Sequence, residues 1–403
     1  MAADTSTRIV WEKILRQAIC IRVHSFKVIF LVVIIIVIAW TISQTRCLTF
    51  DINARTGQGN SIQGANANAA LQETDAPIHT DTRVILLTYM RSGSTFTSEL
   101  FQTHPDVFFM FEPLHTTWYY QPKVIPYLHN YKRIYFDDME KFITDVKIDT
   151  LTKILQCQFK NLDILTLIQE HWHHSKTTKA YKLCTMDQRG VAGIEKCISI
   201  LTNACSKAKV NFIKTINLTI HEAEHFIAKD PHLKLIYLVR DPRAILSSQM
   251  RYGEFVPNRL NSYSEMFCRT MLSDIQGYAK LKKIHPKQVI FVRYEEIAHK
   301  PIPLTETLYD FVGLSLTQNV TKHIYNITNG GNDVDCALCI SKSNSTKAAE
   351  IWRMQTTHDF VQIVDSNCKH VYQYIGYLPI LNASTLTDMN IPVRTSPFHD
   401  LVL

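Results

Sequence analysis

Residues 84–102 read VILLTYMRSGSTFTSELFQ, and this stretch decides the fold. A run of apolar residues leads into a short polar loop around Gly93, and a helical pattern over Thr97–Gln102 follows, stopped by His104 and Pro105. Because the run is continuously apolar rather than alternating, it predicts a strand that is covered on both faces of a sheet. A strand, a glycine-containing loop and a helix in this order direct backbone N–H groups and the positive end of a helix at an anion.

The loop itself offers groups suited to a phosphate. Gly93 allows close approach of the backbone, Ser94 and Thr95 carry hydroxyl groups, and Arg91 can make a charge-assisted contact. The sequence does not form a Walker A loop, G-x-x-x-x-G-K-[ST]. Taken alone, the segment is equally compatible with an ordinary serine-rich turn between a strand and a helix.

A second segment strengthens the phosphate interpretation. The apolar run Leu233–Val239 ends in Arg240, and a helical pattern follows in which Pro242 suits the first turn and Asp241 the N-cap. Arg240 at the end of the strand and Ser248 two turns into the helix are expected to converge on one phosphate. The alternative for Arg240 is an ordinary salt bridge with Asp241 or with a surface partner.

Two further apolar runs, over residues 211–216 and 289–292, are also followed by helical patterns. Strands alternating with helices predict an α/β domain whose central, mostly parallel sheet is flanked by helices. Ligands of such sheets bind at the carboxyl ends of the strands. The net charge of +7 suits acidic partners. Nucleic acid is not expected as a partner, because the sequence contains no arginine-rich tract, zinc-finger spacing or RNP-like motif.

The N-terminal part predicts a membrane protein. The uncharged run VIFLVVIIIVIAWTI, extended to residues 23–42, has the length of one transmembrane signal-anchor helix. Basic residues within 1–22 predict a cytoplasmic tail. Residues 43–80 are expected to form a stem, 81–390 a luminal domain and 391–403 a C-terminal tail. A cleaved signal peptide and a buried core helix are the alternatives.

Nine cysteines follow the predicted span, so at least one lacks an intrachain partner. Cys47, next to the membrane, is the candidate for an interchain bond and hence for a homodimer. Cys184, Cys197 and Cys205 are expected to contribute one local disulfide and one longer-range disulfide.

Two segments carry a specific resemblance. Residues 86–115, LLTYMRSGSTFTSELFQTHPDVFFMFEPLH, resemble the 5′-phosphosulfate-binding segment of the membrane-bound carbohydrate 6-O-sulfotransferases, in the galactose, N-acetylgalactosamine and N-acetylglucosamine branch. Residues 233–250, LKLIYLVRDPRAILSSQM, resemble the 3′-phosphate-binding segment of that family. The likeness extends from about Arg83 to Pro379. One departure is Asn217, which stands where a similar family strand usually continues with arginine.

The resemblance implies a P-loop-related sulfotransferase fold, 3′-phosphoadenosine 5′-phosphosulfate (PAPS) as co-substrate and no metal. It also implies a single-pass type II protein of the Golgi membrane, with a luminal catalytic domain that sulfates glycans on glycoproteins or proteoglycans. By the resemblance, the 3′-phosphate would be held by Arg240 and Ser248, and the 5′-phosphosulfate by Arg91, Ser92, Gly93, Ser94, Thr95 and Phe96.

Sulfuryl transfer by in-line displacement needs a base for the sugar hydroxyl and cations for the leaving oxygen. We expect Glu112 to be the base, with His115 as the second candidate and Arg91 as the stabilising cation. In related glycan sulfotransferases, a glutamate that corresponds to Glu112 looks like the base. The structural alternative is that Glu112 pairs with a buried arginine.

Three other interpretations are open. Asp333-Val334-Asp335 could serve a glycosyltransferase that uses a nucleotide sugar and a divalent metal. Zinc could bind to His171, His173 and His174, or to Cys336 and Cys339, although no second cysteine pair at zinc-site spacing accompanies either set. A glycan-binding ectodomain without catalytic activity is the last alternative.

Overall fold

The computed structural model describes residues 82–119, 124–133, 139–331 and 338–395. They belong to one compact unit, Thr74–Leu403, and the other unit, Met1–Glu73, lies outside the described residues. The predicted anchor at 23–42 and Cys47 therefore lie outside them as well. Within the described ranges, no helix combines the length and the apolar character needed to cross a bilayer.

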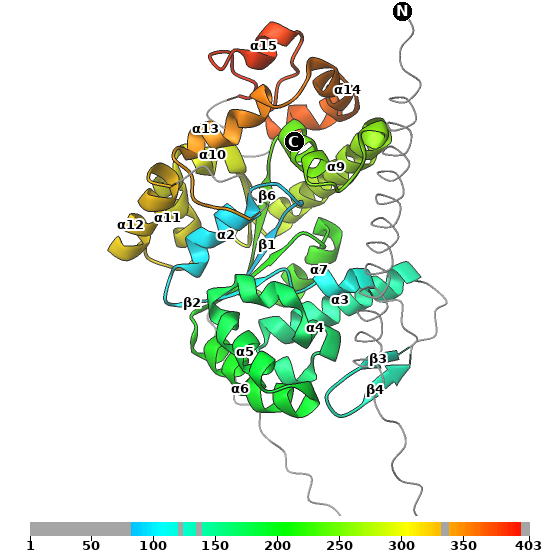
Figure 1. Cartoon of the computed structure of the whole chain (residues 1–403), viewed down its shortest axis with the longest axis vertical. Helices are drawn as coiled ribbons and strands as arrows, with labels where there is room; N and C mark the ends of the chain where they lie inside the picture. Colours follow the sequence, from blue (N-terminus) through cyan, green and yellow to red (C-terminus); the bar gives the residue numbers. More distant parts are fainter. Residues whose placement is uncertain (1–81, 120–123, 134–138, 332–337, 396–403) are drawn as a thin grey trace, which may run out of the picture. The chain divides into compact units, whose positions relative to one another are not determined.

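A five-stranded parallel sheet forms the centre of the domain, in the order β2-β5-β1-β6-β7 (Figure 1). The predicted parallel sheet is confirmed, with strand ends shifted by up to two residues. Val107–Phe111 was not predicted as a strand. The strands are β1 (Thr82–Leu87), β2 (Val107–Phe111), β5 (Val210–Thr215), β6 (Leu233–Val239) and β7 (Val289–Arg293), and a hairpin adds β3 (Val124–Pro126) and β4 (Tyr131–Arg133).

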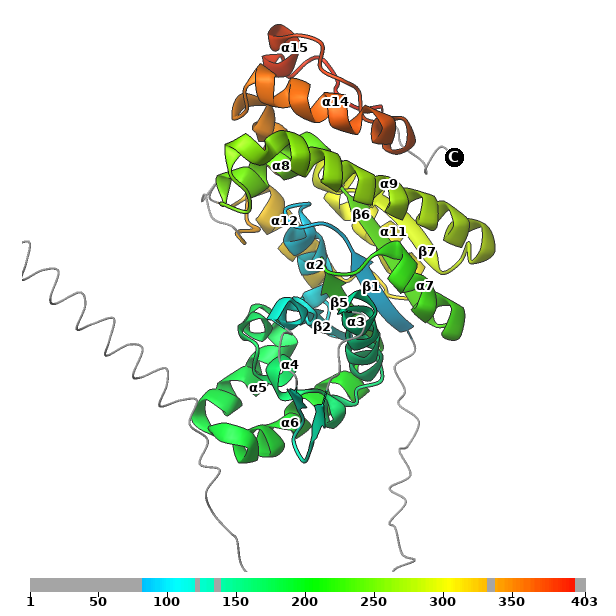
Figure 2. The same cartoon turned by 90° about the vertical axis from the view of Figure 1, so that its right-hand side faces the viewer.

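Helices cover both faces of the sheet (Figure 2). They are α2 (Ser94–Gln102), α3 (Met139–Leu155), α4 (Ile164–Ile168), α5 (Lys176–Asp187), α6 (Gly190–Lys207), α7 (Ile220–Lys229), α8 (Pro242–Arg251), α9 (Leu260–Ile284), α10 (Tyr294–His299), α11 (Pro301–Val312), α12 (Gln318–Asn329), α13 (Ser345–Glu350), α14 (His358–Ile375) and α15 (Ala383–Thr387). Short 3-10 turns are η1 (His115–Tyr119), η2 (Phe159–Asn161), η3 (Glu170–His174), η4 (Pro257–Arg259) and η5 (Ile351–Met354).

The continuously apolar β1 supplies two separate cores, as side chains alternate along a strand. Val84 and Leu86 pack with residues of α2, α11 and α12, while Ile85 and Leu87 pack with residues of α6, α7 and α9. All four side chains are fully buried. The strand is thus covered on both faces, as predicted.

Disulfides tie the covering helices together. Cys184–Cys197 is local, with a sequence separation of 13, and Cys157–Cys205 has a separation of 48, as expected. Cys268–Cys368 joins α9 to α14, which lie side by side (Figure 2).

Buried arginines attach the C-terminal segment to the sheet. Arg243 Nη1 donates to the carbonyl of Leu378 at 2.9 Å, and Arg293 Nη2 donates to that of Thr395 at 2.7 Å. Arg353 donates to four carbonyl oxygens around α15, those of Thr385, Leu386, Asp388 and Ile391. Because these desolvated cations take many of their acceptors from the C-terminal backbone, the segment up to Thr395 is part of the domain.

A buried polar chain lies beneath the end of β1. The Tyr89 hydroxyl contacts the Tyr237 hydroxyl at 2.7 Å and donates to Asp274 Oδ2 at 2.8 Å, while the Ile220 N–H donates to Asp274 Oδ1 at 2.8 Å. Burial raises the pKa of Asp274 to about 6, although the two hydrogen bonds oppose the shift.

This pKa predicts a pH dependence of stability. The pKa of an unfolded aspartate is ~3.9, so the protonated form favours folding, and that stabilisation is lost as the pH rises through about 6. Asp274→Asn mimics the neutral form. Relative to the unmodified protein, its free energy of unfolding, measured with urea, should therefore rise by up to about 3 kcal/mol between about pH 4 and pH 7. The control Ser206→Ala, an exposed substitution in α6 that removes no titratable group, should show a flat difference. If the free energy of unfolding of Asp274→Asn, relative to the unmodified protein, does not change with pH, the raised pKa of Asp274 is contradicted.

Candidate active site

The loop between β1 and α2 lies at the carboxyl ends of the parallel strands, at the edge of the sheet that carries the polar residues described below. Gly93 is the N-cap of α2 with φ of 84°, and a Cβ atom there would meet Cδ2 of Tyr294 at 2.2 Å. Only glycine satisfies both the left-handed backbone and this close approach. The first N–H groups of a helix have no acceptor within the helix, so the amides at the start of α2 face this edge as anion donors.

The side chains of the loop divide into two groups. The Ser92 hydroxyl is buried, contacts the Thr88 hydroxyl and donates to the Tyr89 carbonyl at 2.6 Å, so it shapes the loop. Phe96 packs edge-on against Tyr294 and belongs to the core. Ser92 and Phe96 therefore contribute to the predicted phosphosulfate-binding segment through the shape and packing of its backbone, and not through side-chain contacts with a ligand.

Arg91, Ser248 and Arg240 come together beside this loop. Arg91 Nε donates to Ser248 Oγ at 2.9 Å, and Arg240 Nη1 donates to the Arg91 carbonyl at 3.2 Å. Each guanidinium also lies over an aromatic ring, Arg91 at 4.3 Å from the centroid of Tyr252 and Arg240 at 4.7 Å from that of Tyr294. Burial lowers the pKa of Arg91, and the nearby charge of Arg240 acts in the same direction.

The arrangement fits a phosphate group. Arg240 Nε is buried and has no hydrogen-bond partner among the described residues. A buried cationic donor without an acceptor costs free energy unless a ligand satisfies it. The alternative of a salt bridge between Arg240 and Asp241 is not what the structure shows, because Asp241 pairs with Arg243 at 2.7 Å.

Asp241 and Arg243 support the turn that presents Arg240. Asp241 is the predicted N-cap of α8, and its carboxylate accepts from the N–H and the side chain of Arg243. Burial opposes the charge of Arg243, but Asp241, Tyr372 and Asp365 together outweigh this effect and raise its pKa. Arg243 therefore holds the backbone in place and does not face the edge of the sheet.

Glu112 follows β2 at the same edge and pairs with a lysine, not with the arginine that the structural alternative expected. Its backbone has φ of 44°, and its N–H donates to the Lys214 carbonyl at 2.9 Å. Its carboxylate forms an ion pair with Lys214 Nζ, whose side chain is 2% exposed. Burial lowers the pKa of Lys214, an effect that Glu112 opposes and Arg91 reinforces.

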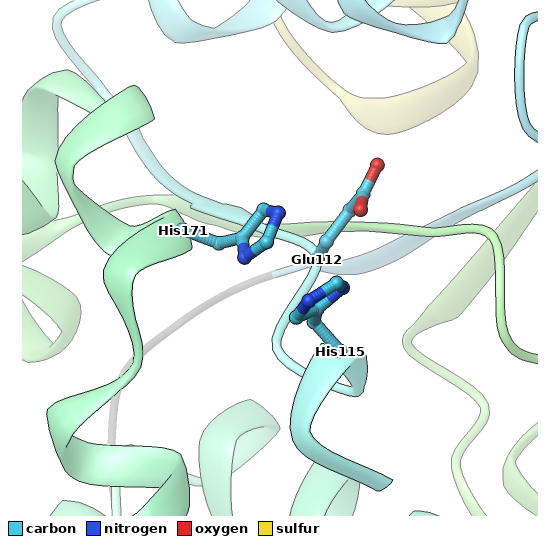
Figure 3. Close-up of side chains that lie close together, drawn as sticks. All are labelled: Glu112, His115 and His171. Atoms are coloured by element: carbon cyan, nitrogen blue, oxygen red, sulfur yellow. The ribbon is translucent and has the colours of Figure 1, made fainter. Parts of the chain in front are cut away.

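Two histidines lie next to Glu112 (Figure 3). The rings of His115 and His171 have centroids 3.8 Å apart. Burial and the neighbouring His115 lower the pKa of His171 to about 4, while Glu112 acts against the shift. The structure thus brings the two predicted base candidates together and adds His171 from η3.

A family model described as the sulfotransferase domain matches residues 81–333, more than half of the chain. The chain belongs to the sulfotransferase family. It is 28% identical over 349 residues to carbohydrate sulfotransferase 1 of Danio rerio, covering 77% of this chain and 81% of that protein. Carbohydrate sulfotransferase 5 of Homo sapiens is 24% identical over 383 residues and 87% of each chain.

Solved sulfotransferase structures are also similar. The sulfotransferase domain of a Synechococcus olefin synthase has a TM-score of 0.39 and 18% identity, covering 73% of this chain and 97% of that chain. A mouse sulfotransferase complexed with PAP has a TM-score of 0.38 and 14% identity, covering 72% and 84%. The family match makes this protein a sulfotransferase enzyme and does not favour the glycosyltransferase alternative. Asp333 and Asp335 lie outside the described residues.

Sequence reasoning missed two residues of this sulfotransferase site. Lys214 was recognised only as part of a strand, and its pairing with Glu112 depends on the register of β2 and β5, in which Phe111 lies opposite Lys214. Tyr294 falls within the range Arg83–Pro379 that resembles the family but carried no prediction of its own, and nothing local in the sequence places its ring on Gly93.

The contact between Gly93 and Tyr294 predicts a large cost for a methyl group. Gly93→Ala combines left-handed strain of ~1–2 kcal/mol with overpacking of ~1–3 kcal/mol. Gly253→Ala is the matched control, because Gly253 has φ of 82° but open space at the Cβ position. We expect chemical denaturation to show a loss about twice as large for Gly93→Ala. Equal losses would mean that the Tyr294 ring moves aside freely.

Proposed function

We propose that this enzyme transfers the sulfuryl group of PAPS to the 6-hydroxyl of galactose, N-acetylgalactosamine or N-acetylglucosamine in glycans on glycoproteins or proteoglycans. The convergence of Arg91 and Arg240 carries the proposal, together with Arg240 Nε, which has no hydrogen-bond partner in the part of the chain that the structure describes. The named carbohydrate sulfotransferases among the relatives support the acceptor class.

The donor half of the site has groups for two phosphates. The amides at the start of α2 and the Arg91 guanidinium suit the 5′-phosphosulfate, with Ser94 and Thr95 adding hydroxyl groups. Arg240 and Ser248 suit the 3′-phosphate. The Arg91 side chain donates to Ser248 and so links the residues proposed for the 5′-phosphosulfate to those proposed for the 3′-phosphate.

The acceptor half supplies the base. In the proposed step, Glu112 takes the proton of the sugar hydroxyl, the sugar oxygen forms a bond to sulfur, and the bond from sulfur to the phosphate oxygen of the nucleotide breaks. Arg91 stabilises the charge left on that oxygen. Lys214 keeps the Glu112 carboxylate beside the loop in the resting state, and the approaching hydroxyl competes for this carboxylate.

The cellular part of the proposal rests on the sequence alone. Residues 23–42 would anchor the enzyme in the Golgi membrane as a type II protein, and Cys47 would link two chains.

The 3′-phosphate assignment predicts the effect of removing Arg240. Arg240→Ala removes charge-assisted hydrogen bonds worth ~1.5–3 kcal/mol each, so calorimetry should show about 10- to 100-fold weaker binding of 3′,5′-phosphoadenosine phosphate to the full chain. The control Arg269→Ala removes an exposed cation of α9 and should bind normally. Unchanged binding in Arg240→Ala would refute the assignment. Stabilisation by a uridine nucleotide sugar with manganese, and not by the bisphosphate, would favour the glycosyltransferase alternative.

The base assignment predicts the effect of neutralising Glu112. Glu112→Gln should lower kcat by about 10²- to 10⁴-fold, because the proton of the acceptor loses its positioned base, while calorimetric binding of the bisphosphate stays unchanged. Glu170→Gln, an exposed carboxylate of η3, is the control and should retain activity. Should Glu112→Gln stay active while His115→Gln does not, His115 is the base.

A further inference from the structure

A cluster of three side chains, Glu112, His115 and His171, contains more potential metal ligands than proton transfer requires. One ligand atom from each residue lies within 4.8 Å of those from the other two. The three side chains come from the end of β2, from η1 and from η3 (Figure 3). Two imidazoles and one carboxylate are the protein ligands of open, three-ligand zinc sites, in which the fourth position takes water or substrate.

The backbone that carries these ligands is fixed by its own hydrogen bonds. The His115 N–H donates to the Glu112 carbonyl at 3.1 Å, which sets the spacing of the first two ligands. The side chain of Gln169, just before η3, donates to the Pro113 carbonyl at 3.1 Å and so joins η3 to this turn. Trp172, next to His171, is fully buried and anchors η3 in the core. The cluster is therefore preorganised, as ligand binding requires.

The distances between the ligand atoms are somewhat longer than those of a zinc site. Zinc bonds to nitrogen and oxygen are ~2.0–2.2 Å long, so ligand atoms of a tetrahedral site lie roughly 3.4 Å apart. The ligand atoms of the cluster all lie within 4.8 Å of one another, so they have to approach by at most roughly 1.4 Å to reach that geometry. The metal has to compete with Lys214 for the Glu112 carboxylate, or use its second oxygen.

We propose that Glu112, His115 and His171 bind Zn²⁺ or a similar divalent transition metal, and that the bound metal inhibits the enzyme by engaging the carboxylate of Glu112. Imidazole ligands favour zinc, cobalt, nickel and copper over magnesium and calcium. The metal is an inhibitor here and not a requirement of the reaction. The inhibition rests on the proposed function of Glu112, whereas the binding does not.

Binding can be measured without any activity. The purified full chain, freed of metal by a chelator, is titrated with Co²⁺, and the visible absorption of the protein-bound ion is recorded before displacement by Zn²⁺. We expect one equivalent to bind and Mg²⁺ not to compete. His171→Gln should weaken the affinity at least tenfold, and the control His173→Gln, exposed on the same turn, should keep it. Affinity in His171→Gln equal to that of the unmodified protein would overturn the site.

A second variant guards against misfolding as an explanation. Lys214→Met removes the cation that competes for Glu112, so the affinity for Co²⁺ should rise about tenfold or more, a gain that structural damage would not produce. A weaker affinity in Lys214→Met would contradict the proposal.

Activity separates the two claims. Zn²⁺ at saturation should suppress sulfuryl transfer at least tenfold, with activity restored by the chelator. If Zn²⁺ binds at this site and transfer continues at its full rate, the metal site stands and the inhibition, together with Glu112 as the base, is refuted.

Discussion

The site depends on one unfavourable arrangement, the approach of two guanidinium groups in a partly desolvated space. Arg91 and Arg240 follow neighbouring parallel strands, so the register of β1 and β6 leaves both at one edge of the sheet. Their mutual repulsion is offset by an acceptor carbonyl and by the faces of Tyr252 and Tyr294. Such a pair is a cost to the free protein, and the two phosphate groups of the proposed donor would offset it.

Much of the surrounding structure maintains that arrangement. Tyr294 serves two purposes at once, since its ring faces Arg240 and also excludes any side chain larger than that of glycine at position 93. Behind it, Glu295 accepts from the N–H of Asp241, which in turn pairs with Arg243. The charged residues that look most functional in the sequence thus divide into those that lie at the edge of the sheet and those that hold the backbone.

The sequence predicted the elements that depend on local patterns. Branched apolar runs identified four strands, and Asp241 with Pro242 identified the start of α8. It did not predict β2 at Val107–Phe111. Contacts between distant segments were also out of reach. Glu112 and Lys214 are 102 positions apart, and the segment that carries His171 is joined to the turn after β2 by the hydrogen bond of Gln169. Such contacts depend on strand order, which no local pattern encodes.

The buried arginines near the C-terminus also constrain how the protein can be made. Arg243 and Arg293 lie in the middle of the chain, but several of their acceptors are carbonyl groups of residues 375–395. Until those residues have been synthesised, the turn that presents Arg240 sits beside cations without their full set of partners. The proposed donor site therefore cannot mature during translation of the amino-terminal half. A nascent chain halted before residue 375 would carry every side chain of the proposed donor site and still lack the acceptors that stabilise it.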